Sequence, residues 1–441
     1  MPSSVLTCLL MTSIFMFLVL PTYVKLALRE RRAAKKYATS TAAGRNEPAS
    51  IRPLVDRGAC MGSGACVTAC PEDVLGIVNG QVQVIAGSKC IGHGVCARVC
   101  PVDAIQLVFG SEKRGIDIPE VGPDFQTNVP GLYVAGELGG MGLIANAVEQ
   151  GQQAMTAAAK GLRSPKGVLD VVIVGAGPAG MGAGLKAQEL NLDYLIVEQD
   201  DFGGAVRHYP RQKLVMTRPM KLPGYGKISL KSALKEELID LFEEVVQATG
   251  LKIRTGLRVD AITPQGGVFS IRAGEEELRA SRVILAIGRR GTPRKLNIPG
   301  EEQEKVTYRL LDPERYRYQH LLIVGGGDSA VEAAVSLGEQ EGNKVTLAYR
   351  GAAISRPKED NVERLRVAQE KGQVEVRLEC SPVRIEADRV LLKHRGEELE
   401  IPNDFIFVMV GGVLPTKFLQ ASGIQILRHH GRRVERVQAP R

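Results

Sequence analysis

Residues 170–198 read DVVIVGAGPAGMGAGLKAQELNLDYLIVE, and this stretch decides the fold. It predicts a buried strand, a Gly-rich turn, a helix and a second strand that ends in an acid. Gly175 permits the tight turn, Gly177 lets the backbone approach a pyrophosphate, and Gly180 lets the helix pack on the strand. The helix N-terminus presents free N–H groups to the phosphates. The predicted dinucleotide-binding residues here are Gly175, Gly177, Pro178, Ala179, Gly180 and, through the ribose hydroxyls, Glu198.

The composition is that of a folded α/β protein with several domains. The chain has 441 residues, 44% of them hydrophobic, and 49 glycines; these values exclude a disordered chain. Its net charge of +8 predicts either an ordinary solvated surface or a docking face for an acidic redox partner or anionic lipid. Residues 426–441 are predicted to be a basic tail. No nucleic-acid motif accompanies the charge, so no nucleic-acid partner is expected.

The N-terminus predicts a membrane anchor. Residues 1–24 carry no charged side chain, and a bilayer core requires about 20 apolar residues. Basic residues follow this run rather than precede it, and no small-residue cleavage site follows it, which is unlike a signal peptide. By the positive-inside rule we expect a single-pass anchor with its basic flank in residues 1–36, and the catalytic domains in the cytoplasm. A cleaved export signal is the alternative. Residues 37–53 predict a linker.

Six of the eight cysteines form two blocks that repeat at a spacing of 30 residues. A proline follows the last cysteine of each block. The repeat resembles bacterial two-cluster ferredoxins, in which the fourth cysteine of each run ligates the other cluster. Residues 54–110 are therefore predicted to be a ferredoxin-like domain with two iron–sulfur clusters. The predicted metal ligands are Cys60, Cys66, Cys70, Cys90, Cys96 and Cys100.

Both blocks depart from the ferredoxin pattern at the second cysteine, which is replaced by Ser63 and by His93. The resemblance implies one cluster on Cys60, Cys66 and Cys100, and the other on Cys90, Cys96 and Cys70. Each cluster then has three thiolates and one open corner. The corner is empty in a 3Fe-4S cluster, or the fourth iron of a 4Fe-4S cluster takes water or a side chain. His93 is a candidate ligand or a surface residue, whereas Ser63 is not expected to ligate. Loss of a thiolate is expected to raise each potential.

The segment before the first Gly-rich turn predicts a short buried strand that ends at Gly136 and Glu137, then a glycine turn and a helix. It resembles the closing flavin motif of two-dinucleotide flavoproteins, which usually has Asp at the second position and lies at the C-terminus. We therefore expect a circular permutation, in which residues 115–165 complete an FAD domain of residues 166–294 from its N-terminal side. A linker helix with a coincidental motif is the alternative.

A second Gly-rich loop lies 150 residues after the first and predicts a second nucleotide domain, residues 295–425. Its following strand ends in Arg350, where an acid would select NAD. A guanidinium can bind a 2′-phosphate through two hydrogen bonds, which favours NADPH over NADH. Arg356 is either a second phosphate contact or a solvated charge. The candidate residues are Gly325, Gly327, Asp328, Ser329, Ala330, Arg350 and Arg356, with Gly204 and Gly288 as further candidates in the first domain.

Residues 165–425 resemble the thioredoxin-reductase-like branch of pyridine nucleotide flavoproteins. Within it they are most similar to YpdA-type bacillithiol-disulfide reductases, because of the run from Gly203 to Lys213. The resemblance implies an α/β fold with two Rossmann-like domains, FAD on the Gly175 loop, NADPH on the Gly325 loop, and hydride transfer to the flavin. Relatives of this shape are commonly homodimers, so a homodimer is a possible assembly.

The redox cysteines of these relatives are missing. Residues 306–320 contain no Cys-x-x-Cys pair, and Ala179 occupies the position of the YpdA-type cysteine. Cys8 and Cys380 are predicted to be small buried apolar residues. Dithiol exchange is therefore not expected, and no catalytic side chain is identified beyond the flavin itself. The clusters offer another outlet, because flavin accepts two electrons as hydride and releases them singly.

These predictions favour a membrane-anchored oxidoreductase that passes electrons between NADPH, FAD and the clusters to a redox partner. The partner would be a quinone, a cytochrome or a soluble redox protein. Electrons would pass from NADPH to this partner, or from the partner to NADP⁺. One alternative is NADPH-dependent reduction of a low-mass disulfide at the flavin, with structural clusters. Another is a redox or iron sensor.

Overall fold

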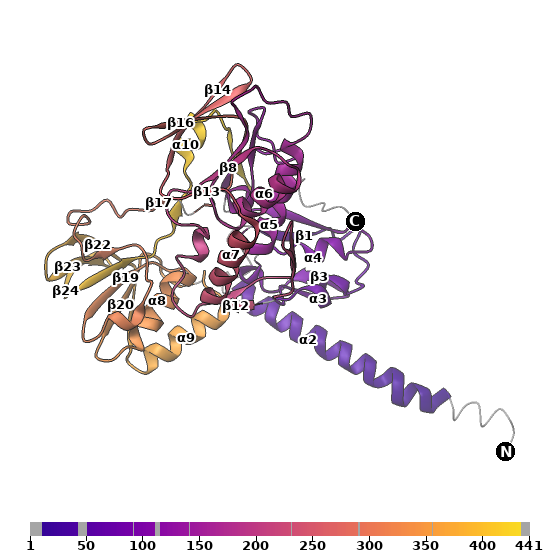
Figure 1. Ribbon diagram of the computed structural model, residues 1–441. Coiled ribbons are helices and arrows are strands. Elements are labelled where there is room, and N and C mark those ends of the chain that lie inside the picture. Colours follow the sequence, from indigo (N-terminus) through magenta and orange to yellow (C-terminus); the bar gives the residue numbers. More distant parts are fainter. Residues whose placement is uncertain are drawn as a thin grey trace. The chain divides into compact units, whose positions relative to one another are not determined.

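The computed structural model describes residues 11–42, 51–90, 92–110, 115–140, 142–230, 232–289, 292–354 and 356–433. The chain divides into two compact units, Met1–Glu112 with Gly431–Arg441, and Lys113–His430 (Figure 1). The first contains the cysteine blocks and the second contains both Gly-rich loops. Cys8 lies outside the described residues.

The N-terminal helix is long, and its only buried side chain among the described residues, Ala33, lies in its C-terminal half. It consists of a π-helical turn, η1 (Phe15–Val19), and α2 (Leu20–Ala42). Residues Met11–Ala42 form a helix long and apolar enough to cross a membrane. The side chains of Ala33, Ala34 and Tyr37 pack against Val78 and Ile85 of the cysteine-containing unit. The helix ends at Ala42 and so extends into the predicted linker of residues 37–53.

The rest of the first unit consists of short elements around the two cysteine blocks. Its strands are β1 (Ile51–Val55), β2 (Leu75–Val78), β3 (Gln81–Val84), β4 (Ile105–Phe109) and β28 (Arg432–Arg433), and its helices are α3 (Ala65–Ala69), η2 (Gly87–Lys89) and α4 (Val95–Arg98). The order of the three-stranded sheet is β1-β4-β28, and β2 and β3 form a hairpin. Helices α3 and α4 each contain the middle cysteine of a block. The first strand thus occupies the end of the predicted linker.

The described part of the predicted basic tail, residues 426–433, contains two short strands. Residues Ile426–His429 form β27, which pairs antiparallel with β5 (Ile116–Pro119), and β28 pairs antiparallel with β4. The edges of β5 and β4 offer unpaired backbone groups, and a strand that satisfies them is favoured over a solvated tail.

The second unit begins with a seven-stranded sheet (Figure 1). Its strands are β6 (Leu132–Val134), β7 (Leu169–Val174), β8 (Tyr194–Val197), β13 (Ile253–Arg254), β14 (Val259–Gln265), β15 (Val268–Ala273) and β16 (Glu276–Leu285). The order is β13-β8-β7-β16-β15-β14, with β6 also paired to β16. Val283 of β16 lies opposite Val172 of β7 on one side and Leu132 of β6 on the other, both in parallel register.

Three helices accompany this sheet: α5 (Ile144–Ala158), α6 (Pro178–Glu189) and α7 (Lys235–Thr249). Helices α5 and α6 pack so closely that their contact requires glycine. A Cβ on Gly151 would lie 1.9 Å from the Ala179 carbonyl oxygen, and one on Gly182 would lie 2.3 Å from the Val148 oxygen. The segment before the first Gly-rich loop thus shares one buried core with the helix that follows the loop.

The second sheet is parallel throughout and has the order β18-β25-β19-β20-β21. Its strands are β18 (Val306–Thr307), β19 (His320–Val324), β20 (Lys344–Tyr349), β21 (Val374–Leu378) and β25 (Phe405–Val408), accompanied by α8 (Asp328–Gly338) and α9 (Glu359–Glu370). An antiparallel sheet of β22 (Cys380–Ile385), β23 (Arg389–His394) and β24 (Glu397–Pro402) follows. Cys380 is only 1% exposed, as predicted for a buried apolar residue.

Smaller elements complete the unit. They are β9 (Leu214–Met216) with β12 (Ser232–Leu234), β10 (Met220–Leu222) with β11 (Gly226–Ile228), β17 (Thr292–Pro293) with β26 (Gly412–Val413), the turns η3 (Gly136–Gly139), η4 (Gly204–Val206) and η5 (Pro313–Arg315), and α10 (Thr416–Ala421).

Candidate functional site

The first Gly-rich loop leaves open space at the start of α6. Gly175 has φ +105°, and a Cβ there would lie 2.6 Å from the Ala286 oxygen; one on Gly180 would lie 1.8 Å from the Gly175 oxygen. Both positions therefore require glycine. At Gly177, the N-cap of α6, a Cβ would meet only the Cα of Gly204, at 3.7 Å. No side chain caps this helix, so its first N–H groups are available to a phosphate.

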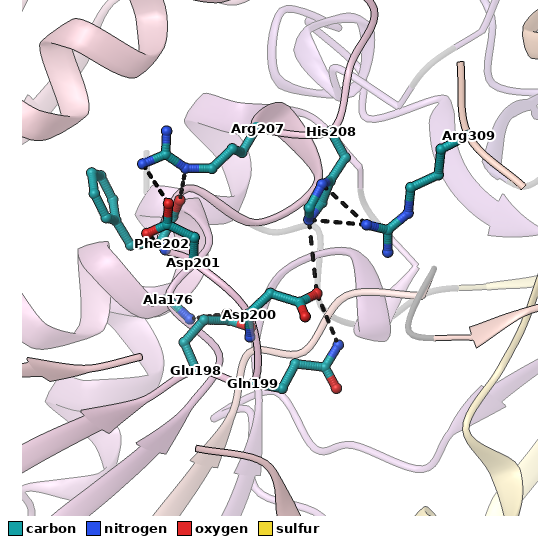
Figure 2. Close-up of polar contacts among 9 residues, drawn as sticks. All are labelled: Ala176, Glu198, Gln199, Asp200, Asp201, Phe202, Arg207, His208 and Arg309. Atoms are coloured by element: carbon teal, nitrogen blue, oxygen red, sulfur yellow. Dashed lines mark hydrogen bonds and ion pairs between the residues drawn. The ribbon is translucent and has the colours of Figure 1, made fainter. Parts of the chain in front are cut away.

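Glu198 directly follows β8, and its side chain lies beside Ala176 of the first Gly-rich loop (Figure 2). Its Oε2 accepts a hydrogen bond from the Ala176 amide at 2.8 Å, and its Oε1 accepts one from the Asp200 amide at 3.2 Å. These bonds fix the carboxylate beside the Gly-rich loop. A carboxylate in this place can accept further hydrogen bonds from ribose hydroxyls, because each oxygen has more than one lone pair.

The closing motif meets the same loop. Gly136 has φ +78°, and a Cβ there would lie 2.8 Å from the Cβ of Ala179. Its amide donates a hydrogen bond to Gln150 Oε1 at 3.0 Å, and Glu137 follows in η3. Gly288, after the closing strand β16, has φ +63° and open space where a Cβ would stand. Residues from three segments far apart in sequence therefore surround the N-terminus of α6.

Arg289 is a neighbour of this site that sequence reasoning missed. Burial lowers the pKa of its guanidinium, while the carboxylates of Glu137 and Asp117 oppose that shift. Its Nη2 donates a hydrogen bond to the Asp117 carbonyl oxygen at 3.4 Å. The only signal in the sequence is a basic residue directly after Gly288. Arg289 thus brings a half-buried positive charge to the Glu137 carboxylate.

The second Gly-rich loop has the same construction as the first. Gly325 has φ +152°, and a Cβ there would lie 2.4 Å from the Met409 oxygen and 2.9 Å from the Cβ of buried Ala330. Gly327 is the uncapped N-cap of α8, and a Cβ there would meet nothing within 4 Å. Ser329 is exposed in the first turn of the helix. The start of α8 is therefore open to a phosphate.

Two exposed arginines lie between β20 and α9, which follow α8 in the sequence. Arg350 follows β20, and Arg356 precedes α9. Asp328 Oδ1 accepts hydrogen bonds from the Lys358 amide at 2.8 Å and from Asn361 Nδ2 at 2.7 Å. These bonds tie the loop that carries Arg356 to the first residue of α8. Within the described part of the chain neither guanidinium has an ion pair, so both are available to an anion.

The six block cysteines form two neighbouring sets of thiols. Burial, followed by the charges of Cys100 and Cys60, raises the pKa of the Cys66 thiol. Burial raises the pKa of Cys90 to about 11 and that of Cys96 to about 12, and Cys70 contributes to both shifts. Cys66 also contributes to the shift of Cys96, so the sets adjoin.

These thiols do not converge on a single point. Among the described residues, no three His, Cys, Asp or Glu side chains are grouped closely enough to hold one metal ion. A cluster needs a different arrangement, because each thiolate binds a different iron. Two sets of three thiols, of which Cys66 is buried and the other five are half-buried, fit such clusters, and iron binding would displace their protons.

Glycines at equivalent places in the two blocks shape the loops around the thiols. Gly62 and Gly92 have φ of +69° and +83°, and Gly64 and Gly94 have +73° and +72°. Side chains are disfavoured at this φ, so the Cys-x-Gly-x-Gly pattern is a signal that sequence reasoning overlooked. Of the two residues that replace cysteine, Ser63 is exposed and His93 is half-buried.

Comparisons with known proteins agree with this construction. A family model described as pyridine nucleotide-disulphide oxidoreductase matches residues 172–435, more than half of the chain. The chain belongs to the pyridine nucleotide-disulphide oxidoreductase family. A second model, described as a 4Fe-4S dicluster domain, matches residues 52–101. The predicted α/β fold with a ferredoxin-like domain, the NAD(P)H-dependent flavoenzyme class, and the cofactors FAD, NADPH and iron–sulfur clusters are thereby confirmed.

The relatives of this protein match its nucleotide-binding part. Bacilliredoxin reductase Bdr of Bacillus subtilis is 25% identical over 59% of this chain and 82% of its own. A ferredoxin–NADP reductase of Ignicoccus hospitalis is 29% identical over 55% of this chain and 76% of its own. The solved structure of bacillithiol disulfide reductase Bdr (YpdA) from Bacillus cereus has a TM-score of 0.54 and 24% identity, covering 58% of this chain and 82% of that one, and shares the fold.

The nucleotide-binding unit of this protein has no exposed thiol near its Gly-rich loops. Its only cysteine between residues 113 and 430 is Cys380, which is buried in β22. Ala179 stands in the first loop, buried against Gly136. A disulfide substrate therefore finds no cysteine nucleophile in the nucleotide-binding unit.

Proposed function

We propose that the protein is a membrane-anchored flavin and iron–sulfur oxidoreductase that moves electrons between NADPH and a redox partner. The observation that carries this proposal is the pair of three-thiol sets, buried or half-buried, in a chain whose nucleotide-binding unit has no reactive cysteine. Ferredoxin–NADP reductase relatives favour it as well. In this chain a ferredoxin-like domain is part of the same polypeptide.

The FAD site is proposed at the N-terminus of α6, where the Gly-rich loop, Glu198 and the closing motif meet. The uncapped N–H groups of α6 would bind the pyrophosphate, and Glu198 would bind the ribose. Residues 115–165 are proposed to complete this domain, since β6 pairs with β16. The proposed FAD contacts are Gly136, Glu137, Gly175, Gly177, Pro178, Ala179, Gly180, Glu198, Gly204 and Gly288.

The NADPH site is proposed at the N-terminus of α8. The uncapped helix end would bind the pyrophosphate, while Arg350 and Arg356 would bind the 2′-phosphate. When bound, FAD exchanges two electrons as hydride with the nicotinamide and single electrons with iron–sulfur clusters. The proposed NADPH contacts are Gly325, Gly327, Asp328, Ser329, Ala330, Arg350 and Arg356.

The cluster ligands are proposed as the two thiol sets, Cys60 with Cys66 and Cys100, and Cys70 with Cys90 and Cys96. The Ala104 amide donates a hydrogen bond to Cys100 Sγ at 3.2 Å. Such a bond stabilises a thiolate and raises the potential of a cluster that it ligates. Half-buried His93 is proposed as a ligand at one open corner, and exposed Ser63 is not.

The long N-terminal helix is proposed to be a single-pass anchor with both units in the cytoplasm. Residues Met11–Ala42 have the length and apolar composition of a membrane span, and their apolar part is followed by basic residues. An anchored enzyme meets partners at the membrane, which favours a quinone or a membrane-bound cytochrome over a soluble protein.

An anaerobic titration of the full-length protein, with clusters reconstituted, tests the function. NADPH is added while flavin absorbance and cluster EPR are followed in the same sample. We expect both signals to change within one turnover time. Bleaching of flavin while the clusters stay oxidised would refute electron transfer between them. Cys66→Ser should remove one cluster signal and leave the flavin bleaching intact, whereas the control Cys380→Ala should change neither.

Reduction of a low-mass disulfide is the second candidate, because Bdr is among the relatives. Disulfide-dependent oxidation of NADPH that survives Cys66→Ala would favour this activity over the first. Absence of that oxidation with low-mass disulfides, together with rapid reduction of a one-electron acceptor, would exclude it.

A further inference from the structure

A cavity of about 650 Å³ lies in the nucleotide-binding unit, and none of its lining residues belongs to either Gly-rich loop. Two stretches that are far apart in sequence line it. Arg211 and Lys235 come from the region around β9, β12 and α7, and the other lining residues lie between Pro293 and Tyr316. Its volume is in the range of small-molecule sites, roughly 300–1,000 Å³.

The lining is strongly cationic. Four basic side chains line the cavity, Arg211, Lys235, Arg309 and Arg315, against a single carboxylate, Asp312. One oxygen of that carboxylate, Oδ2, accepts a hydrogen bond from Arg315 Nε at 3.2 Å, while the buried Oδ1 has no partner among the described residues. The remaining positive charges repel one another, and an anion between them would remove that cost.

The other three cations have no acidic partner among the described residues. Arg309 donates its Nη1 hydrogen bond to the ring of His208, 3.1 Å from Nδ1, as Figure 2 shows. Burial and the charge of Arg309 lower the pKa of His208, although Asp200 opposes this from the other side of the ring. Arg211 and Lys235 make no side-chain ion pair in the described part of the chain.

Neighbouring bases differ in this respect. Arg207 pairs with Asp201 at 2.8 Å and with Glu243 at 3.4 Å, and Lys213 pairs with Glu332 at 2.8 Å. Arg207 and Lys213 thus have acidic partners, whereas Arg211, Lys235 and Arg309 have none among the described residues. An unpaired set of bases around a hollow is the arrangement expected of an anion site.

Part of the cavity wall is held in place by its own hydrogen bonds. The Tyr308 hydroxyl donates to Glu301 Oε1 at 2.7 Å, and burial together with that carboxylate raises the pKa of Tyr308 to about 12. Tyr316 packs edge-on against Phe405 and Phe407, with ring centroids 5.2 and 5.1 Å apart. The backbone is joined across the cavity as well, since the Arg211 amide donates to the Leu311 oxygen at 3.0 Å.

We propose that this cavity binds a small organic polyanion with at least two phosphate or carboxylate groups, at a site separate from FAD and NADPH. None of the residues proposed above for either dinucleotide lines the cavity. Guanidinium groups bind phosphates and carboxylates through paired hydrogen bonds, so one ligand can bridge Arg211 and Arg309. Such a ligand would connect the two lining stretches of the unit.

Isothermal titration of the full-length holoprotein tests the site, with pyrophosphate and citrate as probes near 0.15 M salt. Pyrophosphate would identify a phosphate ligand and citrate a carboxylate ligand. We expect one of them to bind with a stoichiometry of one, equally in the absence and presence of saturating NADP⁺. Arg211→Ala and Arg309→Ala should each weaken it about tenfold, the cost of one charge-assisted contact.

Arg258→Ala is the matched control, because it removes the same charge from an exposed side chain outside the cavity. It should leave the affinity unchanged, and Arg309→Lys should restore part of it. Flavin content and melting temperature establish that the variants are folded. Three outcomes would overturn the site: no binding of either probe, displacement by NADP⁺, or equal weakening by Arg258→Ala. None of them bears on the NADPH titration that tests the proposed function.

Discussion

Gly180 is a residue at which the backbone permits no side chain. A Cβ there would lie 1.8 Å from the Gly175 oxygen, at the loop proposed to bind FAD. We expect Gly180→Ala to destabilise the protein by about 1–3 kcal/mol through overpacking, and to release FAD. Flavin absorbance of the purified protein and thermal unfolding measure both effects. Gly327→Ala is the control for stability, since a Cβ there meets nothing within 4 Å. Wild-type flavin content in Gly180→Ala would contradict the proposed loop geometry.

Arg350 decides, in our proposal, which nicotinamide cofactor is used. Its guanidinium is exposed and available to a 2′-phosphate, a group that NADH lacks. We expect Arg350→Ala to raise KM for NADPH about tenfold with little change in kcat, because a ground-state contact is lost. NADH serves as the internal control, and its kcat/KM should not change. Equal losses with both cofactors would place Arg350 outside the phosphate site.

At the scale of elements, Glu301 binds the segment before β18 through hydrogen bonds, and we expect its contribution to the stability of the protein to depend on pH. Glu301 Oε2 accepts a hydrogen bond from the Asn297 amide at 2.7 Å, and Oε1 accepts one from the Tyr308 hydroxyl at 2.7 Å. Burial acts to raise the pKa of Glu301, but these bonds and one from the Leu296 amide lower it below 4.5.

Because the folded pKa of Glu301 is depressed, its stabilisation is present above the unfolded value and is lost as pH falls through the folded value. Glu301→Gln should therefore cost about 1 kcal/mol at pH 7 and progressively less below pH 4.5. Urea unfolding of both proteins at pH 7 and pH 4 measures the difference. A cost that is the same at both pH values would mean that the charge is not responsible.

The elements also show what local sequence patterns can and cannot predict. The glycines of both loops and the cysteine repeat are contiguous motifs, so the strands, turns and helices around them were foreseen. Strands β27 and β28 were not, because their partners β5 and β4 lie far away in sequence. The basic cavity was missed for the same reason, since Arg211 and Arg309 meet only after folding. The length of α2 depended on a buried contact of Ala33 that no periodicity revealed.

For the molecule as a whole, the proposed anchor can be separated from the chemistry. Deleting residues 1–24 removes most of the apolar run but keeps the part of α2 that contacts the rest of its unit. We expect a water-soluble protein with full FAD and cluster content and unchanged NADPH-dependent reduction of a soluble one-electron acceptor. Sedimentation with membranes and acceptor kinetics measure the two properties. Loss of cluster content in the truncated protein would show that the apolar run serves folding rather than anchoring.

The contact between α2 and the hairpin of β2 and β3 limits how far the cluster-binding unit can move relative to the proposed membrane anchor. Glu30 Oε1 accepts a hydrogen bond from the Gly80 amide at 2.9 Å, and Gly76 lies so close to Ala33 that a Cβ on it would be 2.9 Å from the Cβ of Ala33. A helix rises 1.5 Å per residue, so under the proposed anchoring about 9 Å of helix, from Val24 to Glu30, separates the bilayer edge from the contact with the hairpin. The clusters could not swing on a tether like a mobile carrier. They would stay at one height above the lipid, and the electron partner would have to diffuse to them.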